Sequence, residues 1–188
     1  MGQTSFFGLR LQTAPGDVMT PRPATEGLVA AAAARIHGRA RVADIGTGSG
    51  AIAVALALAA PQAEVWATDI SPAAVMLARV NARRYGVEDR VHALRGDLLA
   101  PVPADLDLIV ANLPYLPREE RPWHRELAAE PEDAVFADGD GLGPYRTLLD
   151  GAAQKLASGG AALIQLHRRV LVADRDRLEE LAAMLRAA

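Results

Sequence analysis

The sequence predicts a doubly wound α/β domain, in which helices cover both faces of a mostly parallel β-sheet. Three observations lead to this prediction. Short apolar runs alternate with longer helical stretches, and a glycine-rich loop follows the first apolar run. Acidic residues stand at the ends of the first three apolar runs. Strands that alternate with helices favour a parallel sheet, which binds ligands beyond the carboxyl ends of its strands. The length suits one domain, which we expect over residues 1–188, with residues 1–23 as an N-terminal hairpin segment.

The start of the chain is expected to form a hairpin and then a helix. Residues 7–19 alternate weakly between apolar and polar side chains around Pro15-Gly16-Asp17, which are residue types typical of a turn. Prolines then interrupt this pattern, and a helical spacing of apolar residues over 24–37 ends at a glycine.

The rest of the chain alternates regularly between strand and helix patterns. Strand patterns occupy residues 41–45, 64–69, 91–95, 106–111 and 161–166. Helix patterns occupy residues 50–60, 72–85, 144–156 and 170–187. The strand at 161–166 is expected to be the last of the sheet, since only a helix follows it.

Composition and charge exclude several classes of protein. The chain has no cysteine, which excludes disulfide scaffolds and cysteine-ligated metal centres and fits a reducing, cytoplasmic location. Its net charge of −3 argues against a general binder of polyanions. The ten-residue run 51–60 is the longest apolar one and is too short to cross a bilayer, which takes about 20 residues. Four scattered histidines lack a metal-ligand spacing, so no metal is expected: His37, His92, His124 and His167.

A glycine-rich loop follows the strand at 41–45. Its sequence is Asp44-Ile45-Gly46-Thr47-Gly48-Ser49-Gly50. Glycine permits a tight turn and a close approach of a ligand to the backbone, and the helix that follows presents free N–H groups. The spacing also fits the dinucleotide pattern G-x-G-x-x-G/A, and a purely structural turn has the same appearance, so the loop by itself leaves the ligand open.

Two more acids are expected at the same edge of the sheet. Asp69 ends the strand at 64–69, and Asp97 follows the strand at 91–95. A carboxylate here can accept hydrogen bonds from ribose hydroxyls, although each acid alone is also typical of a helix cap or a turn. Together with Asp44, the two acids predict a ligand that contains a nucleoside.

These residues resemble the successive motifs of class I S-adenosylmethionine-dependent methyltransferases, which have a Rossmann-like fold. The resemblance implies S-adenosyl-L-methionine as cofactor and S-adenosyl-L-homocysteine as product. Asp44 and the glycines would hold the methionine moiety, Asp69 the ribose, and Asp97 the adenine amino group. An acidic crevice suits the sulfonium and ammonium of this cofactor, whereas Asp44 would repel the pyrophosphate of NAD. The implied cofactor residues are Asp44, Gly46, Thr47, Gly48, Gly50, Asp69, Ile70, Asp97, Leu98 and Asn112.

The catalytic residues are expected at Asn112-Leu113-Pro114-Tyr115, directly after the strand at 106–111. Methylation of an amide or aromatic amine requires the lone pair of its NH₂ group to point at the methyl group. An asparagine oxygen and the carbonyl of Leu113 can accept the two hydrogens and leave that direction free. Pro114 would stiffen the loop and Tyr115 would form an apolar wall, although a plain turn after a buried strand remains the alternative.

This tetrapeptide is similar to the (N/D)PPY motif of amino-methyltransferases, with Leu113 in place of the first proline, and it also resembles the ribosomal-RNA adenine dimethyltransferases. Further segments resemble the HemK/PrmC family of protein-(glutamine-N5) methyltransferases, which act on translation release factors: Pro21-Arg22-Pro23-Ala24-Thr25-Glu26, Glu130-Pro131, Asp138-Gly139-Asp140-Gly141-Leu142 and Tyr145-Arg146. In that family the first of these segments lies over the cofactor and substrate pocket. The resemblance therefore implies pocket roles for Pro21, Arg22, Thr25 and Glu26.

We expect an enzyme that transfers a methyl group from S-adenosylmethionine to a glutamine side-chain amide in a protein such as a release factor. Two alternatives stay open: adenine-N6 methylation of RNA or DNA, and a catalytically inactive methyltransferase-like subunit. No membrane association is expected.

Two departures from the family concern the ends of the chain. The bacterial release-factor enzymes carry an N-terminal helical domain, whereas few residues precede the hairpin here. The family's sheet usually continues after the fifth strand with a helix and an antiparallel strand pair, which we expect to be truncated here. The strand at 161–166 would then be an exposed edge, and we expect a homodimer or a small partner subunit to cover it.

Overall fold

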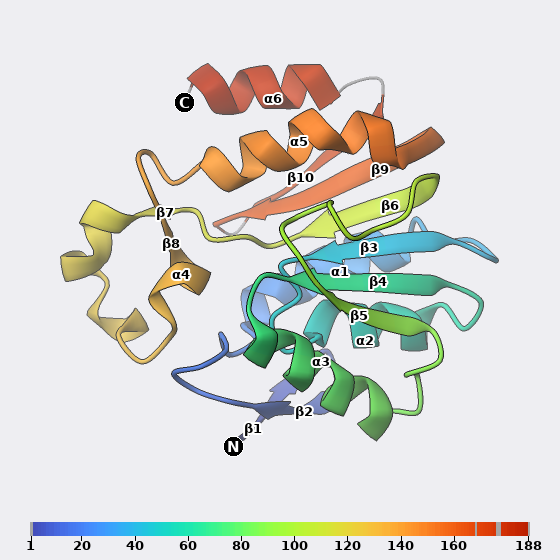
Figure 1. The fold of residues 1–188 in the computed structure, drawn as a ribbon, viewed down its shortest axis with the longest axis horizontal. Coiled ribbons are helices and arrows are strands. Elements are labelled where there is room, and N and C mark those ends of the chain that lie inside the picture. The colour runs from blue at the N-terminus through green and yellow to red at the C-terminus, as the bar shows by residue number, and fades with distance from the viewer. Residues whose placement is uncertain (1, 168, 176–177, 188) are drawn as a thin grey trace.

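The structure is a computed structural model that describes residues 2–167, 169–175 and 178–187. Its centre is a six-stranded sheet in the order β10-β9-β6-β3-β4-β5 (Figure 1). Five of these strands are parallel: β3 (Arg41–Ile45), β4 (Glu64–Asp69), β5 (Val91–Arg95), β6 (Leu106–Ala111) and β9 (Leu156–Leu166). The sixth strand, β10 (Arg169–Asp174), runs antiparallel to β9. The predicted doubly wound α/β architecture is confirmed, and β3 to β6 have the predicted bounds.

Helices cover both faces of this sheet. They are α1 (Glu26–Ala33), α2 (Ala51–Ala59), α3 (Pro72–Arg84), α5 (Gly143–Lys155) and α6 (Leu178–Ala187). α1 and α2 pack on one face and α5 and α6 on the other, so that Val42 of β3 contacts the first pair and its neighbour Ala43 lies on the side of the second. α3 packs beside β4 and β5 (Figure 1). No helix within the described ranges is long and apolar enough to cross a membrane.

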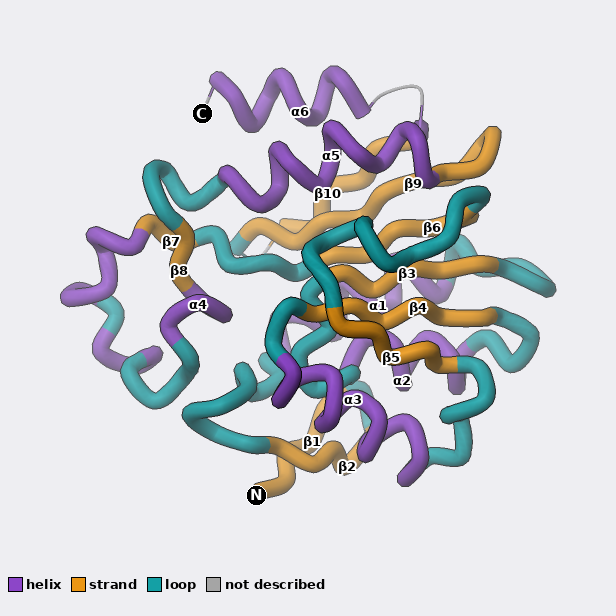
Figure 2. Tube along the Cα trace, viewed as in Figure 1, coloured by secondary structure: helices purple, strands orange, loops and turns teal. Residues whose placement is uncertain are grey.

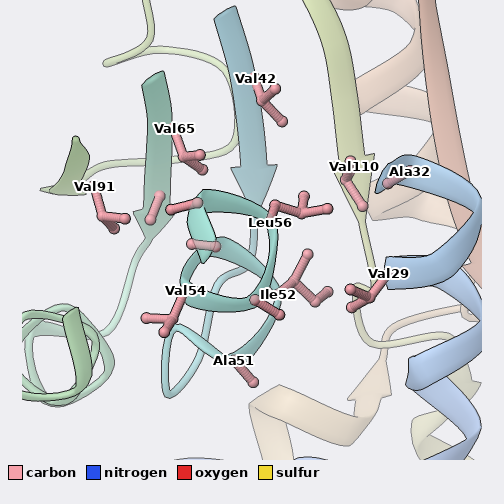
Figure 3. Close-up of a cluster of buried hydrophobic side chains, with 14 of the residues drawn as sticks. Val29, Ala32, Val42, Ala51, Ile52, Val54, Leu56, Val65, Val91 and Val110 are labelled. Atoms are coloured by element: carbon pink, nitrogen blue, oxygen red, sulfur yellow. The ribbon is translucent and has the colours of Figure 1, made fainter. Parts of the chain in front are cut away.

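The first seven residues of the helix that follows the glycine loop are buried on all sides. Residues 51–57 of α2 each expose 6% or less of their surface, as expected for a helix without a polar face. Figure 3 shows Ile52, Val54 and Leu56 among the valines of the sheet and of α1. Because α2 begins directly after the loop, this core fixes the position of the loop at the carboxyl edge of the sheet.

The segment between β6 and α5 lies beyond the carboxyl edge of the sheet, and we call residues 116–142 the rim segment. It contains β7 (Leu116–Pro117), two short 3₁₀ turns (Arg118–Trp123 and Arg125–Leu127), α4 (Glu132–Val135) and β8 (Phe136–Ala137), which pairs with β7. Figure 2 shows these as short pieces separated by loops. The guanidinium of Arg118 ties them together through ion pairs of 2.8 to 3.0 Å with three carboxylates, those of Glu132, Asp133 and Asp138.

The N-terminal hairpin forms, but not at the predicted place. Its strands are β1 (Gly2–Phe6) and β2 (Leu9–Thr13), and the chain turns at Phe7 and Gly8 with φ angles of 48° and 74°. A tight two-residue turn with positive φ at both positions matches the twist of the paired strands. The predicted turn at residues 15–17 instead follows the hairpin, so the predicted location was wrong.

The C-terminal part contradicts the prediction of one helix over residues 170–187. Residues 169–174 form β10, and α6 begins only at Leu178. The apolar run Leu171-Val172-Ala173 fits a strand, and Leu171 packs against the core in that conformation. Because β10 pairs with β9, the expected exposed edge was wrong, and the reason to expect a homodimer or a small partner subunit there falls away. β9 also begins five residues earlier than predicted, at Leu156, and α1 ends earlier, at Ala33.

The close packing of the glycine loop against α3 yields a prediction about stability. Gly50 has a φ of 79°, and a Cβ at this position would lie 2.9 Å from the Cα and Cβ of Ala78. We expect Gly50→Ala to lower the free energy of unfolding by about 2–5 kcal/mol, from backbone strain and overpacking together. Denaturation in urea measures this difference.

Gly27→Ala is the matched control, because Gly27 lies in α1 and a Cβ there would meet nothing within 4 Å. Its stability should be unchanged or higher by up to about 1 kcal/mol. Equal stability of the Gly50 and Gly27 variants would contradict the packing described.

Candidate functional site

The glycine loop folds back on β4 at the carboxyl edge of the sheet. The N–H groups of Gly46 and Thr47 both donate to the carbonyl of Thr68, each at 2.9 Å. Gly46 and Gly48 have φ angles of 71° and 54°. A Cβ at Gly46 would lie 2.7 Å from the Cδ2 of Leu113, so glycine is needed here to bring the loop against the segment that follows β6.

Asp44 lies beneath this loop and is fully buried. Its Oδ2 accepts hydrogen bonds from the Thr47 hydroxyl at 2.6 Å and from the N–H of Ala53 at 3.1 Å. Burial raises the pKa of Asp44 to about 7, although both hydrogen bonds act in the opposite direction. Asp44 lines none of the three cavities at this edge, and its carboxylate shapes the loop. Its Oδ1 is buried without a partner among the described residues, and its role in holding the methionine moiety stays a prediction.

Asp69 holds the same loop from the outside. One of its carboxylate oxygens accepts the N–H of Gly48 and the other accepts the N–H of Ser71, both at 2.9 Å. These bonds join the loop after β3 to the start of α3. A carboxylate offers about four lone-pair positions, so Asp69 retains acceptor capacity toward the cavity that it lines.

The largest cavity at this edge has a volume of about 660 Å³, and we call it the acidic cavity. Four carboxylates line it, those of Asp17, Asp69, Asp97 and Asp133, and among the described residues no Arg, Lys or His does so. Such a surface produces a negative potential that favours a cationic ligand.

Most of the predicted cofactor residues meet at this edge. The acidic cavity is lined by Gly46, Gly48, Asp69, Ile70, Asp97, Leu98 and Asn112, and a small adjoining cavity is lined by Thr47. Gly50 lines neither, because it packs against Ala78 of α3. Gly50 therefore has a role in packing, and its expected role at the ligand stays a prediction.

A second cavity, of about 560 Å³, adjoins the acidic one. Five residues line both: Met19, Asn112, Leu113, Pro114 and Ala134. We call the three consecutive ones, residues 112–114, the partition. Tyr115 lines the second cavity and not the acidic one, together with side chains of the rim segment. The predicted catalytic residues thus lie together at the junction of two cavities.

Asn112 is oriented by a neighbour from the N-terminal segment. Its Nδ2 donates to the Thr25 hydroxyl at 3.1 Å, and Thr25 is 5% exposed. Its Oδ1 receives no hydrogen bond from any residue that the structure describes, so it remains available to a ligand. Gln165, which also lines the second cavity, has a buried Oε1 that lacks a partner among the described residues.

Three of the four predicted substrate-pocket residues line these cavities. Pro21 lines the small cavity, and both Arg22 and Thr25 line the small and the second cavity. Glu26 lines none of the three, and its expected role in the pocket stays a prediction. Its Oε1 instead accepts the N–H of Phe7 at 2.8 Å and supports the turn of the hairpin.

Sequence reasoning missed several residues that line the cavities. The sequence pattern places Asp17 and Met19 in the hairpin, whereas in the structure they follow it and line the acidic cavity. Gln165 and His167 stand at the end of the fifth parallel strand, a position that points to the carboxyl edge and could have identified them. Asp133 comes from the rim segment, which the sequence pattern leaves unplaced. Among the described residues, no group of three or more His, Asp or Glu side chains could hold a metal ion.

The sequence of this chain matches a known protein family. The family model described as the methyltransferase small domain matches residues 23–131, more than half of the chain. The matched range contains the glycine loop, Asp69, Asp97 and Asn112. The chain belongs to the methyltransferase small domain family.

Individual relatives agree with this membership. The chain is 41% identical over 171 residues to the release factor glutamine methyltransferase of Deinococcus radiodurans, a match that covers 89% of this chain and 60% of the relative. For the protein of the same name from Moorella thermoacetica, the identity is 43% over 169 residues, with 88% and 59% covered. The chain therefore spans about three fifths of the length of the curated relatives it matches.

A solved structure supports the fold. The ribosomal protein L11 methylase from Lactobacillus delbrueckii subsp. bulgaricus is similar with a TM-score of 0.56 and 25% identity, and the match covers 77% of this chain and 61% of that one. The predicted Rossmann-like fold of a class I methyltransferase is thereby confirmed.

The buried carboxylate beneath the glycine loop predicts a pH dependence of stability. Its pKa is about 7 in the folded chain, above the ordinary value of 3.8, so between about pH 4 and pH 7 the folded state binds more protons than the unfolded state. The contribution of Asp44 to the free energy of unfolding is therefore fully present below about pH 4. It is lost as the pH rises through 7, at a rate of up to about 1.4 kcal/mol per pH unit.

Asp44→Asn removes this titration and keeps an oxygen acceptor for Thr47 and Ala53. The difference in free energy of unfolding between wild type and Asp44→Asn, measured in urea at several pH values, should fall from pH 5 to pH 7 and level off above about 7.5. A difference that is constant over this range would show that Asp44 titrates at its ordinary pKa.

Proposed function

We propose that the acidic cavity binds S-adenosylmethionine and that the chain methylates the side-chain amide nitrogen of a glutamine in a protein such as a translation release factor. S-adenosylhomocysteine would be the product, and a cytoplasmic place of action is part of the proposal. The names of the relatives support the substrate, and the lining of the two cavities supports the chemistry.

The charge of the acidic cavity fits this cofactor. S-adenosylmethionine carries a sulfonium and an ammonium and supplies an electrophilic methyl group. Asp133 is paired with Arg118, and the other three carboxylates of the cavity, those of Asp17, Asp69 and Asp97, favour these cations and disfavour the pyrophosphate of a dinucleotide. Asp69 would accept hydrogen bonds from the ribose with its remaining lone pairs, and Asp97 from the adenine amino group.

The observation that carries the proposed reaction is the orientation of Asn112 between the two cavities. Because its Nδ2 is engaged by Thr25, its Oδ1 is left to accept a hydrogen bond. An NH₂ group that enters from the second cavity can donate one hydrogen to this oxygen and the other to the carbonyl of Leu113. Both hydrogens are then held, and the nitrogen lone pair is directed at the acidic cavity.

A protein substrate fits the rim better than a nucleic acid. Nucleic-acid binding rests on cations that are free to contact phosphates. Arg22 instead pairs with Glu130 at 2.9 Å, and Arg118 and Arg121 pair with carboxylates of the same rim segment at 2.8 to 3.0 Å. Arg22, the arginine that lines the second cavity, is therefore neutralised by Glu130.

Asn112→Ala tests the proposed role of Asn112. We expect kcat for methylation of a release factor to fall at least about 100-fold, because one of the two acceptors for the NH₂ group is lost. The Kd for S-adenosylhomocysteine, measured by calorimetry, should change by less than about threefold. Asn112→Asp keeps an acceptor oxygen and should retain more activity than Asn112→Ala.

Turnover of Asn112→Ala at the wild-type rate would contradict the role of Asn112. Absence of any heat on titration of the wild type with either S-adenosylmethionine or S-adenosylhomocysteine would instead support the inactive-subunit alternative.

A further inference from the structure

We infer that Tyr145 is a positioning residue for the proposed methyl transfer, because its buried hydroxyl fixes the backbone of Leu113 in the partition between the two cavities. The inference rests on the proposed function for its catalytic consequence. The hydrogen bonds themselves are independent of it.

The hydroxyl of Tyr145 joins three parts of the fold. Tyr145 lies in the first turn of α5 and is fully buried. Its Oη lies 2.9 Å from both the backbone N and the backbone O of Leu113, and 2.6 Å from the backbone O of Gln165 in β9. The partition is therefore anchored to one helix and one strand by a single oxygen atom.

A tyrosine hydroxyl has one proton, which limits how these contacts are used. It accepts the N–H of Leu113 and donates to one carbonyl only. The shorter distance assigns the donation to Gln165, which leaves the carbonyl of Leu113 free to accept a hydrogen from an incoming NH₂ group. Burial raises the pKa of Tyr145 above its ordinary value, so the donor proton is retained.

The backbone N–H of Leu113 is present because this residue is not a proline. A proline would fix φ at this position through its ring but would have no N–H to donate. In this chain the hydrogen bond to Tyr145 takes over the restraint that the ring would provide. The Leu113 side chain, packed against Gly46, completes the restraint on the other side.

Tyr145 acts through Leu113, since it lines none of the three cavities. Without its hydroxyl, a buried N–H and a buried carbonyl lose their partner. The partition would then relax, and small displacements of a positioning group have large effects on rate.

Tyr145→Phe should therefore lower kcat about 10- to 100-fold, with changes below about threefold in KM for the release factor and in Kd for S-adenosylhomocysteine. Tyr85→Phe is the matched control, because the Tyr85 hydroxyl also clamps a backbone N–H and carbonyl, those of Arg10, at 2.6 and 3.1 Å. The contact of Tyr85 lies on the N-terminal hairpin and away from the partition, so the kcat of Tyr85→Phe should equal that of the wild type. A kcat of Tyr145→Phe equal to that of the control would overturn the inference.

A double-mutant cycle with Leu113→Pro isolates the contact. Because Leu113→Pro removes the N–H and restrains φ by the ring, adding Tyr145→Phe in this background should lower kcat by less than about threefold. A full 10- to 100-fold loss in the Leu113→Pro background would show that Tyr145 acts in another way.

Hydrogen exchange of the Leu113 amide tests the clamp without activity. We expect this amide to be protected in the wild type and to exchange at least tenfold faster in Tyr145→Phe, with no such change in Tyr85→Phe. Equal exchange in wild type and Tyr145→Phe would overturn the inference even if the enzyme is active. The expected exchange difference in a chain that transfers no methyl group would leave the clamp in place and refute the proposed function.

Discussion

Two carboxylates give the loop after β3 its shape, and the geometry of both cavities depends on that shape. Asp44 holds the loop from within, through Thr47 and the start of α2, and Asp69 holds it from outside, through Gly48 and the start of α3. Neither contact is possible without the close approach that the glycines permit. The cost of burying Asp44 is offset only in part by its hydrogen bonds, as its raised pKa indicates.

The loop in turn determines where the partition between the cavities stands. Leu113 packs against Gly46, Asn112 is turned by Thr25, and the backbone of Leu113 is held by Tyr145. These three supports come from the glycine loop, the N-terminal segment and α5, so distant parts of the chain fix the two oxygens that we propose as acceptors for an incoming NH₂ group. Methylation of an amide depends on the position of its nitrogen and on the exclusion of water from a polar site. It requires no strong base in the ground state.

Much of the sheet and of the site could be predicted from the sequence because the signals are local. The strands β3 to β6, the glycine loop and the acids at the strand ends follow from periodicity and from residue types within a few positions. The failures concern long-range contacts. The strand at 169–174 forms because β9 offers a partner, and a helical pattern of leucines gives no sign of this. For Glu26 and Gly50 the local motifs predict roles at the ligand, and they give no sign of the contacts with Phe7 and Ala78, which lie far away in the sequence.

Tyr145 is the clearest example of what the sequence leaves hidden. It was noted as part of a family segment, yet its role depends on a hydroxyl that reaches Leu113, 32 residues earlier in the chain. No local pattern encodes that contact.

We propose that the partition directs an amide NH₂ group at the acidic cavity. The most direct test is to incubate the chain with a bacterial release factor, total cellular RNA and S-adenosylmethionine labelled in its methyl group, and to locate the label by mass spectrometry. The account predicts one methyl group on the side-chain nitrogen of a glutamine in the release factor. Label on an adenine of the RNA, or on any atom of the protein other than an amide nitrogen, would contradict it.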